Sequence, residues 1–158
     1  MVNNITSISG GCQCGAVRYR IDGPLLSASF CHCRMCQKAA GNIGIAFASA
    51  QPSQVTWTRG APSEFRSSPK VRRGFCADCG TPLYLYEDGH DEIDIHLGSL
   101  DDPAAVEPQR QVGTESKLPW FGRLDGLPGE TTNENNPLAA TGRYASRQHP
   151  DHDTEHWP

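Results

Sequence analysis

Residues 76–80, Cys76-Ala77-Asp78-Cys79-Gly80, hold two cysteines within one tight turn, and the glycine lets the backbone bend toward the sulfurs. Residues 12–15, Cys12-Gln13-Cys14-Gly15, repeat this pattern of a cysteine pair closed by a glycine. A structural zinc ion is tetrahedral and takes four protein ligands, so the two pairs together predict one closed site. Because that site would join distant parts of the chain, we expect its metal to stabilise the fold appreciably.

A third cluster, Cys31-His32-Cys33-Arg34-Met35-Cys36, contains the other three cysteines. A zinc ion with three protein ligands keeps its fourth position for water or substrate, which is the arrangement of catalytic zinc. The spacing therefore predicts two zinc ions per chain, one closed and one open. Two main alternatives remain: a second closed site completed by His32, His96 or a tail histidine, and a redox pair formed by Cys33 and Cys36.

Composition and charge narrow the class of protein. The 158 residues are enough for one domain with its own core. The formal net charge of −4 gives no indication of nucleic acid binding, and no apolar run is long enough to predict a membrane span. Residues 1–10 lack the features of a secretory signal, so we expect a cytoplasmic protein whose seven cysteines bind metal rather than form disulfides. The sequence does not determine the oligomeric state, and a homo-oligomer is compatible with it.

Short strands separated by turns are predicted along most of the chain. Residues 16–21 alternate between apolar and arginine side chains, which is typical of a half-buried strand. Further strands are expected around residues 43–47, 55–57, 65, 83–86 and 93–97. One helix is predicted over residues 32–40, closed by Gly41, and Asp101-Asp102-Pro103 indicates the start of a short second one. The pattern favours a mainly β, layered domain over residues 1–130.

Residues 131–158 differ in composition and are interpreted as a polar C-terminal extension. Few apolar residues occur there, which is typical of a segment that is disordered or that drapes over a domain. Its only large anchors are Tyr144 and Trp157. Three spaced histidines also lie there, but such spacing in a polar tail arises more often by chance than for metal binding: His149, His152 and His156.

Five motifs follow one another between Gly10 and Pro128. They are Gly11-Cys12-x-Cys14-Gly15, Cys31-His32-Cys33-x-x-Cys36, Arg73-Gly74-Phe75-Cys76-x-x-Cys79-Gly80, Gly98-Ser99-Leu100-Asp101-Asp102-Pro103 and Lys117-x-Pro119-Trp120-Phe121. In this order they resemble the glutathione-dependent formaldehyde-activating enzyme family, which includes the centromere protein V domain. The resemblance implies a β-tent, a zinc-clipped fold of short antiparallel strands with little helix.

The resemblance also implies a division of the cysteines. The implied ligands of a structural zinc are Cys12, Cys14, Cys76 and Cys79. The implied ligands of a second zinc, near the place where glutathione binds, are Cys31, Cys33 and Cys36. Lys117 and Trp120 match the family's Lys-Pro-Trp segment and are expected to contact substrate.

The implied reaction is that of a carbon–sulfur lyase acting on an adduct of glutathione, or another thiol, with an aldehyde, such as S-hydroxymethylglutathione. Three thiolate ligands reduce the Lewis acidity of zinc, so such a metal activates or releases a thiol better than it polarises a carbonyl. A fourth thiol that binds the zinc is deprotonated, and the thiolate is a nucleophile toward an aldehyde carbon. The basic residues between Arg59 and Arg73 could attract glutathione, although a solvated strand face is the commoner arrangement.

Two other functions compete with this one. The first is a non-catalytic, zinc-stapled binding module for a protein or a small anionic ligand. The second is a redox sensor that releases zinc on oxidation. The fourth position on the second zinc distinguishes the first two interpretations, because an enzyme would hold water or an exogenous thiol there and a module would hold a protein ligand.

Overall fold

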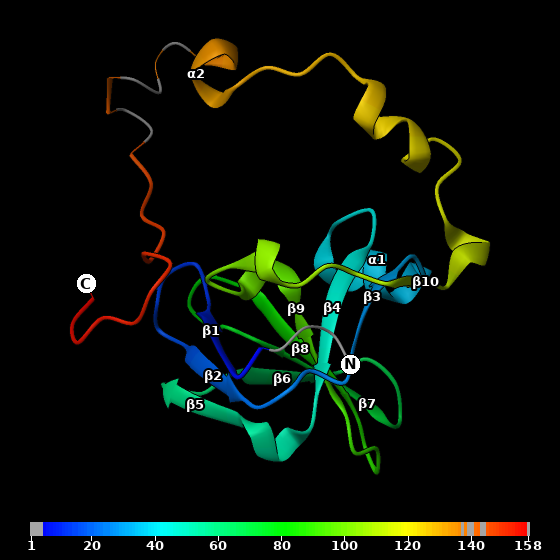
Figure 1. Cartoon of the computed structure of the whole chain (residues 1–158), viewed down its shortest axis with the longest axis vertical. Helices are drawn as coiled ribbons and strands as arrows, with labels where there is room; N and C mark the ends of the chain where they lie inside the picture. The colour runs from blue at the N-terminus through cyan, green and yellow to red at the C-terminus, as the bar shows by residue number, and fades with distance from the viewer. Residues whose placement is uncertain (1–4, 137, 139–140, 143–144, 158) are drawn as a thin grey trace.

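The computed structural model describes residues 5–136, 138, 141–142 and 145–157, and within them two β-sheets form the body of the molecule (Figure 1). The smaller sheet has the order β1-β2-β5, and its strands are β1 (Ser7–Gly11), β2 (Arg18–Asp22) and β5 (Val55–Arg59). The larger sheet has the order β10-β3-β4-β9-β8-β7-β6. Its strands are β3 (Ser27–Cys31), β4 (Ile45–Ala50), β6 (Ser63–Arg66), β7 (Val71–Phe75), β8 (Pro82–Glu87), β9 (Ile93–His96) and β10 (Arg110–Val112).

The predicted mainly β architecture is confirmed, and each of the six expected strands is present. The strands are antiparallel to their neighbours except for β10, which pairs with β3 in parallel and places Val112 opposite Cys31. This pair departs from the expected all-antiparallel arrangement. A parallel pair needs a long connection, and the chain between β3 and β10 supplies one because it forms most of the larger sheet on the way. The parallel pairing brings residues 110–113 beside the middle cysteine cluster.

The hydrophobic core forms where side chains of the two sheets meet. Tyr19 and Ile21 of β2 are fully buried with Leu83 of β8 and Ile95 of β9, at the alternating positions that the sequence pattern predicts. Trp57 of β5 lies 5.6 Å from Tyr19 between ring centroids, in an edge-on contact. Each of these large side chains contributes about 1.5–3 kcal/mol by leaving water, so this core accounts for much of the stability.

The helical segments are short. Helix α1 (Arg34–Ala40) confirms the predicted helix; it begins after Cys33, whose sulfur accepts from the backbone N–H of Cys36, and it ends at Gly41. Gly41 adopts the left-handed conformation that closes a helix. The remaining segments are η1 (Pro52–Gln54), η2 (Leu97–Ser99), η3 (Pro103–Ala105), η4 (Thr114–Ser116), η5 (Phe121–Gly126) and α2 (Thr132–Asn135). No helix in the described part of the chain is long and apolar enough to cross a membrane.

The C-terminal extension leaves the sheets and then returns to them. Figure 1 shows the chain between β10 and α2 forming a wide arch away from the sheets, and the last described residues lying beside β1 and β2. The expected anchor Tyr144 lies outside the described residues. The backbone N–H of His149 donates to the carbonyl of Gln13 at 2.7 Å, and the His149 ring is buried against Trp157. Arg59 donates to the carbonyl oxygen of Thr154. The end of the extension therefore packs on the first cysteine turn.

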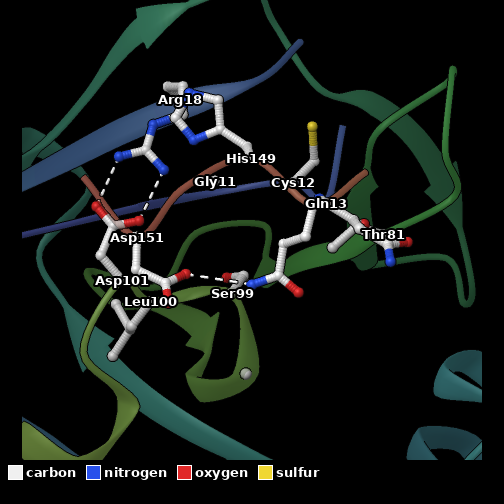
Figure 2. A pocket seen from close by; sticks show the side chains of 12 residues that line it. Gly11, Cys12, Gln13, Arg18, Thr81, Ser99, Leu100, Asp101, His149 and Asp151 are labelled. Carbon is white, nitrogen blue, oxygen red and sulfur yellow. Dashed lines mark hydrogen bonds and ion pairs between the residues drawn. The ribbon is translucent and has the colours of Figure 1, made fainter. Parts of the chain in front are cut away.

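Arg18 connects three separate parts of the chain. Its guanidinium, on β2, donates to both carboxylate oxygens of Asp101 at 2.7 and 2.6 Å and to Asp153 of the extension at 2.7 Å. Figure 2 shows the Asp101 contacts in a polar hollow that His149 and Asp151 also line. The Arg18 side chain is 3% exposed, whereas that of Asp153 is 54% exposed. The ion pair with Asp101 is thus the buried one.

Replacing Arg18 with methionine is expected to lower the free energy of unfolding by about 3 kcal/mol, because it leaves the Asp101 carboxylate enclosed without its partner. Urea unfolding followed by circular dichroism measures this loss. The matched control Asp153→Asn removes only the exposed pair and should cost at most about 1 kcal/mol. Equal losses in the two variants would contradict the assignment of the buried pair to Asp101.

Candidate metal centres

The first and third cysteine clusters, which are far apart in the sequence, come together in the fold. Their four sulfurs all lie within 4.8 Å of one another, on Cys12, Cys14, Cys76 and Cys79. The Cys12 and Cys14 sulfurs are 3.5 Å apart, and those of Cys14 and Cys76 are 3.8 Å apart. A tetrahedral zinc ion with bonds of about 2.3 Å would hold its sulfurs about 3.8 Å apart. The four residues therefore fit the metal that the spacing predicts.

The two turns that carry these cysteines have the same construction. Gly15 and Gly80 both adopt a φ of 76°, which is the left-handed region that favours glycine. A side-chain carbon on Gly15 would come within 2.3 Å of the His149 ring, so the packed extension adds a second reason for glycine there. The backbone N–H of Val17 donates to the Cys12 sulfur at 3.2 Å, a contact of the kind that orients a metal ligand.

The thiols of this four-sulfur cluster ionise unequally. Burial and the neighbouring thiols raise the pKa of Cys14 to about 12. Burial also opposes ionisation of Cys79, but hydrogen bonds from the Thr81 hydroxyl and from backbone N–H groups lower the pKa of Cys79 to about 6. Four thiolates at such short distances require a compensating cation, which a bound divalent metal supplies.

The middle cluster gathers three sulfurs. Cys31 ends β3, Cys33 caps α1 and Cys36 lies in its first turn, and their sulfurs are within 4.8 Å of one another. No fourth histidine, cysteine or carboxylate joins this group among the residues that the structure describes. All seven cysteines of the chain are free of disulfides. The site can therefore take a metal through three protein ligands.

The histidines considered as closing ligands lie elsewhere. The His32 ring is fully buried between Phe30 and Phe121, and its Nε2 lies 2.9 Å from the Gln111 side-chain oxygen. The His96 ring packs edge-on against Phe47 at 5.0 Å. Burial lowers the pKa of His96 to about 4, which keeps the ring neutral at physiological pH.

Residues 110–116 brace the middle cluster. The backbone N–H of His32 donates to the carbonyl of Val112 at 2.9 Å, and the Gln37 amide donates to the carbonyls of His32 and Ser116 at 2.6 and 3.0 Å. Gly113 has a φ of 63°, and a side-chain carbon there would come within 2.6 Å of the Cys33 nitrogen. Neither Gln37 nor Gly113 was predicted as a supporting residue, because a glutamine after Cys36 and a glycine after Val112 carry no signal of their own.

Two cavities share Pro82 and His96 in their walls, and each reaches the middle cluster through one neighbour of its cysteines. Arg73, which contacts Cys36, lines one cavity, and Ile45, which is paired with Cys31, lines the other. The first, of about 380 Å³, is lined by Arg73, Phe65, Phe75 and Tyr84 among others. The second, of about 660 Å³, is more open and its lining includes Phe30, Gly44, Ile45, Phe121 and Leu124. Arg73 also donates through Nη2 to the Cys36 sulfur at 3.6 Å, so it connects the first cavity to the cluster.

The basic stretch between Arg59 and Arg73 divides into two kinds of residue. Arg66 and Arg72 form exposed or half-exposed ion pairs with Asp88, and Arg72 also pairs with Glu64. They match the solvated strand face, whereas Arg73 points inward and is 7% exposed.

Lys117 and Trp120 lie beyond β10, at the start of the arch. Lys117 donates to the Gln111 side-chain oxygen at 2.8 Å and stacks over the Phe121 ring. Trp120 is 41% exposed. The neighbouring Phe121 and Leu124 reach the larger cavity. Contact of Lys117 and Trp120 with substrate stays a prediction.

Comparison with known proteins agrees with the cysteine pattern. A family model described as glutathione-dependent formaldehyde-activating enzyme matches residues 7–116. A Halomonas elongata protein that carries this family's name is 26% identical over 123 residues, covering 72% of this chain and 78% of its own. An uncharacterized lyase of Schizosaccharomyces pombe is 34% identical over 78 residues, which cover 48% of this chain and 55% of that protein.

A crystal structure of a Rhodobacter sphaeroides protein shares the fold, with a TM-score of 0.53 and 21% identity. It covers 66% of this chain and all of its own. The family match extends over more than half of the chain and includes all three cysteine clusters. The chain therefore belongs to the glutathione-dependent formaldehyde-activating enzyme family.

Proposed function

We propose that this protein is a zinc-dependent carbon–sulfur lyase whose substrate is an adduct of a thiol, such as glutathione, with an aldehyde. The observation that carries the proposal is the middle cluster: three sulfurs gathered without a fourth protein donor among the described residues, next to two cavities. The family membership and the name of the Halomonas relative support glutathione as the thiol and formaldehyde as the aldehyde.

In this mechanism the cysteines of the middle cluster and the residues of the cavity wall have different roles. Zinc, when bound, lowers the pKa of an incoming thiol and holds it as the thiolate. Cys31, Cys33 and Cys36 would be the protein ligands, and the backbone at the start of α1 lowers the pKa of Cys33 against the effect of burial. Phe75, Pro82 and Tyr84 give the first cavity a largely apolar wall, which strengthens charge interactions at the reacting atoms.

Addition of glutathione should change the zinc coordination in a measurable way. We expect about two zinc ions per chain, with a mean sulfur coordination that rises from about 3.5 to about 4 when the tripeptide fills the open position. Zinc K-edge X-ray absorption of the purified protein, together with total zinc per chain, makes the measurement. Two zinc ions with an unchanged spectrum would instead favour the non-catalytic binding module.

A further inference from the structure

Arg73 is a buried cation without an acidic partner in the described part of the chain. Its Nε donates to the Ser67 hydroxyl at 3.1 Å, and its Nη2 donates to the Cys36 sulfur at 3.6 Å. Its Nη1 is fully enclosed and has no hydrogen-bond partner among the described residues. A buried donor of this kind is costly, so in the native site a water, an ion or a ligand supplies the missing acceptor.

The negative charge of the metal-loaded middle cluster accounts for the position of the Arg73 guanidinium beside it. Three thiolates and one divalent metal ion leave a single negative charge, which the Arg73 guanidinium neutralises through its contact with Cys36. A fourth thiolate adds a second negative charge in the same enclosed space. Arg73 therefore favours entry of an anionic ligand, because a nearby cation is worth more in a low dielectric than in water.

The direction of the guanidinium restricts what that ligand is. Its two terminal nitrogens belong to one rigid planar fork, so an acceptor bound to Nη1 lies next to the edge that contacts the Cys36 sulfur. In a thiol–aldehyde adduct the sulfur and the oxygen are attached to the same carbon. A ligand whose sulfur joins the three cysteine sulfurs can then place this oxygen at the adjacent donor of the fork.

We propose that Arg73 is a specificity-determining residue, whose Nη1 donates to the oxygen of the adduct and selects ligands with oxygen on the carbon that bears sulfur. This inference rests on the proposed lyase function and names the substrate class of the same site. In this proposal the adduct oxygen lies in the first cavity, whose lining includes Arg73, Tyr84 and His96.

The proposed contact between Arg73 and the adduct oxygen stabilises the negative charge that forms on this oxygen during the reaction. The thiolate sulfur attacks the carbonyl carbon, a carbon–sulfur bond forms, and the π pair of the carbonyl moves onto oxygen. Arg73 donates to that oxygen while it is negative, and the oxygen then takes a proton from solvent. In the lyase direction the hydroxyl loses its proton to solvent, the carbonyl re-forms, and the pair of the broken carbon–sulfur bond returns to sulfur.

Two small thiols of similar size test the selection directly. Thioacetate carries an oxygen on the carbon that bears sulfur, and ethanethiol does not. Calorimetric titration of the zinc-loaded full chain gives the Kd of each. We expect the preference for thioacetate over ethanethiol to fall about tenfold or more in Arg73→Met, the size of one lost hydrogen bond to a charged group. Comparing ratios between proteins removes the difference in basicity of the two thiols.

Arg72→Met is the matched control, because Arg72 is the neighbouring residue on β7 but pairs with Glu64 and Asp88 outside the cavity. It should keep the wild-type preference. Arg73→Lys retains the positive charge without the planar fork, so it should keep two zinc ions and still lose most of the preference.

The outcomes separate this inference from the proposed function. If the wild-type chain binds neither glutathione nor the small thiols, the lyase proposal fails and the role of Arg73 fails with it. If thiols bind and both Arg73 variants keep the wild-type preference, only the role of Arg73 is overturned. Loss of the second zinc in both variants would assign Arg73 to metal retention and also overturn a role in selection.

Discussion

Replacing Cys79 with serine is expected to unfold the protein. Structural zinc contributes on the order of 10–16 kcal/mol in small zinc domains, which equals or exceeds the whole stability of a typical domain. Here the four-sulfur site joins the turn at Cys14 to the turn at Cys76, and the sulfurs on the two sides lie only 3.8 Å apart. Without the fourth ligand the metal would be lost, and the two turns would no longer be joined.

Thermal unfolding followed by circular dichroism, with zinc determined per chain, tests this expectation. The variant should lack a cooperative transition or show it lowered by about 20 °C or more, because a chain of this length loses roughly 2–4 °C per kcal/mol. A strong chelator added to the wild-type protein should reproduce the effect. A variant that melts close to the wild type while retaining one zinc fewer would show that the site does not hold the fold together.

The grouping of the cysteines into two sites could be predicted from the sequence, because the spacing of ligands within one turn is a local property. Two residues between Cys76 and Cys79, and one between Cys12 and Cys14, place each pair in a single turn, and the glycines after them supply the left-handed conformation. The partner of each pair follows from counting ligands. Strands β2 and β9 could also be predicted, since alternation along a strand with one buried face is visible in the sequence.

Strands β1, β3, β7 and β10 were missed because their side chains carry no such pattern. Ser27-Ala28-Ser29 in β3 is a run of small residues, and it forms a strand through its pairing with β4 and β10 on either side. A strand of that kind is defined by its neighbours rather than by its own residues.

The role of Arg73 was hidden for a related reason. Arg72 and Arg73 are adjacent in sequence and look alike, but successive side chains on a strand point to opposite faces. One therefore pairs with Glu64 and Asp88 at the surface and the other reaches the Cys36 sulfur. Without knowing that a strand is present, no reader of the sequence could assign the two arginines to different faces.

The packing of the extension could be predicted only in part. Trp157 was expected as one of its anchors, and it packs against the buried His149 ring. The place where the extension attaches to the body could not be predicted. Its key contact joins the backbone N–H of His149 to the carbonyl of Gln13, and backbone groups are the same in every sequence. Composition described residues 131–158 as polar, and it gave no position at which the chain returns to the body.

Replacing Cys33 with serine is expected to leave the fold intact while abolishing binding of the second metal and the proposed lyase activity. The middle cluster lies within six consecutive residues, so its metal closes no long loop and adds little to stability. A serine hydroxyl is also a favoured helix cap, and it can accept from the backbone N–H of Cys36 as the sulfur does. The melting temperature should therefore change by only a few degrees, in contrast to Cys79→Ser.

The activity should fall by about 100-fold or more, because loss of mere supporting partners around a metal already costs about 10–100-fold and here a ligand itself is removed. Exchange spectroscopy of labelled formaldehyde with glutathione measures the rate, and zinc per chain should drop from about two to about one. Wild-type exchange in a chain with one zinc would place the reaction away from the middle cluster. Equal losses of melting temperature in Cys79→Ser and Cys33→Ser would contradict the distinction between a structural and a reactive site. That distinction depends on the four-sulfur cluster joining turns that are distant in the sequence, whereas the middle cluster joins residues that are close in the sequence.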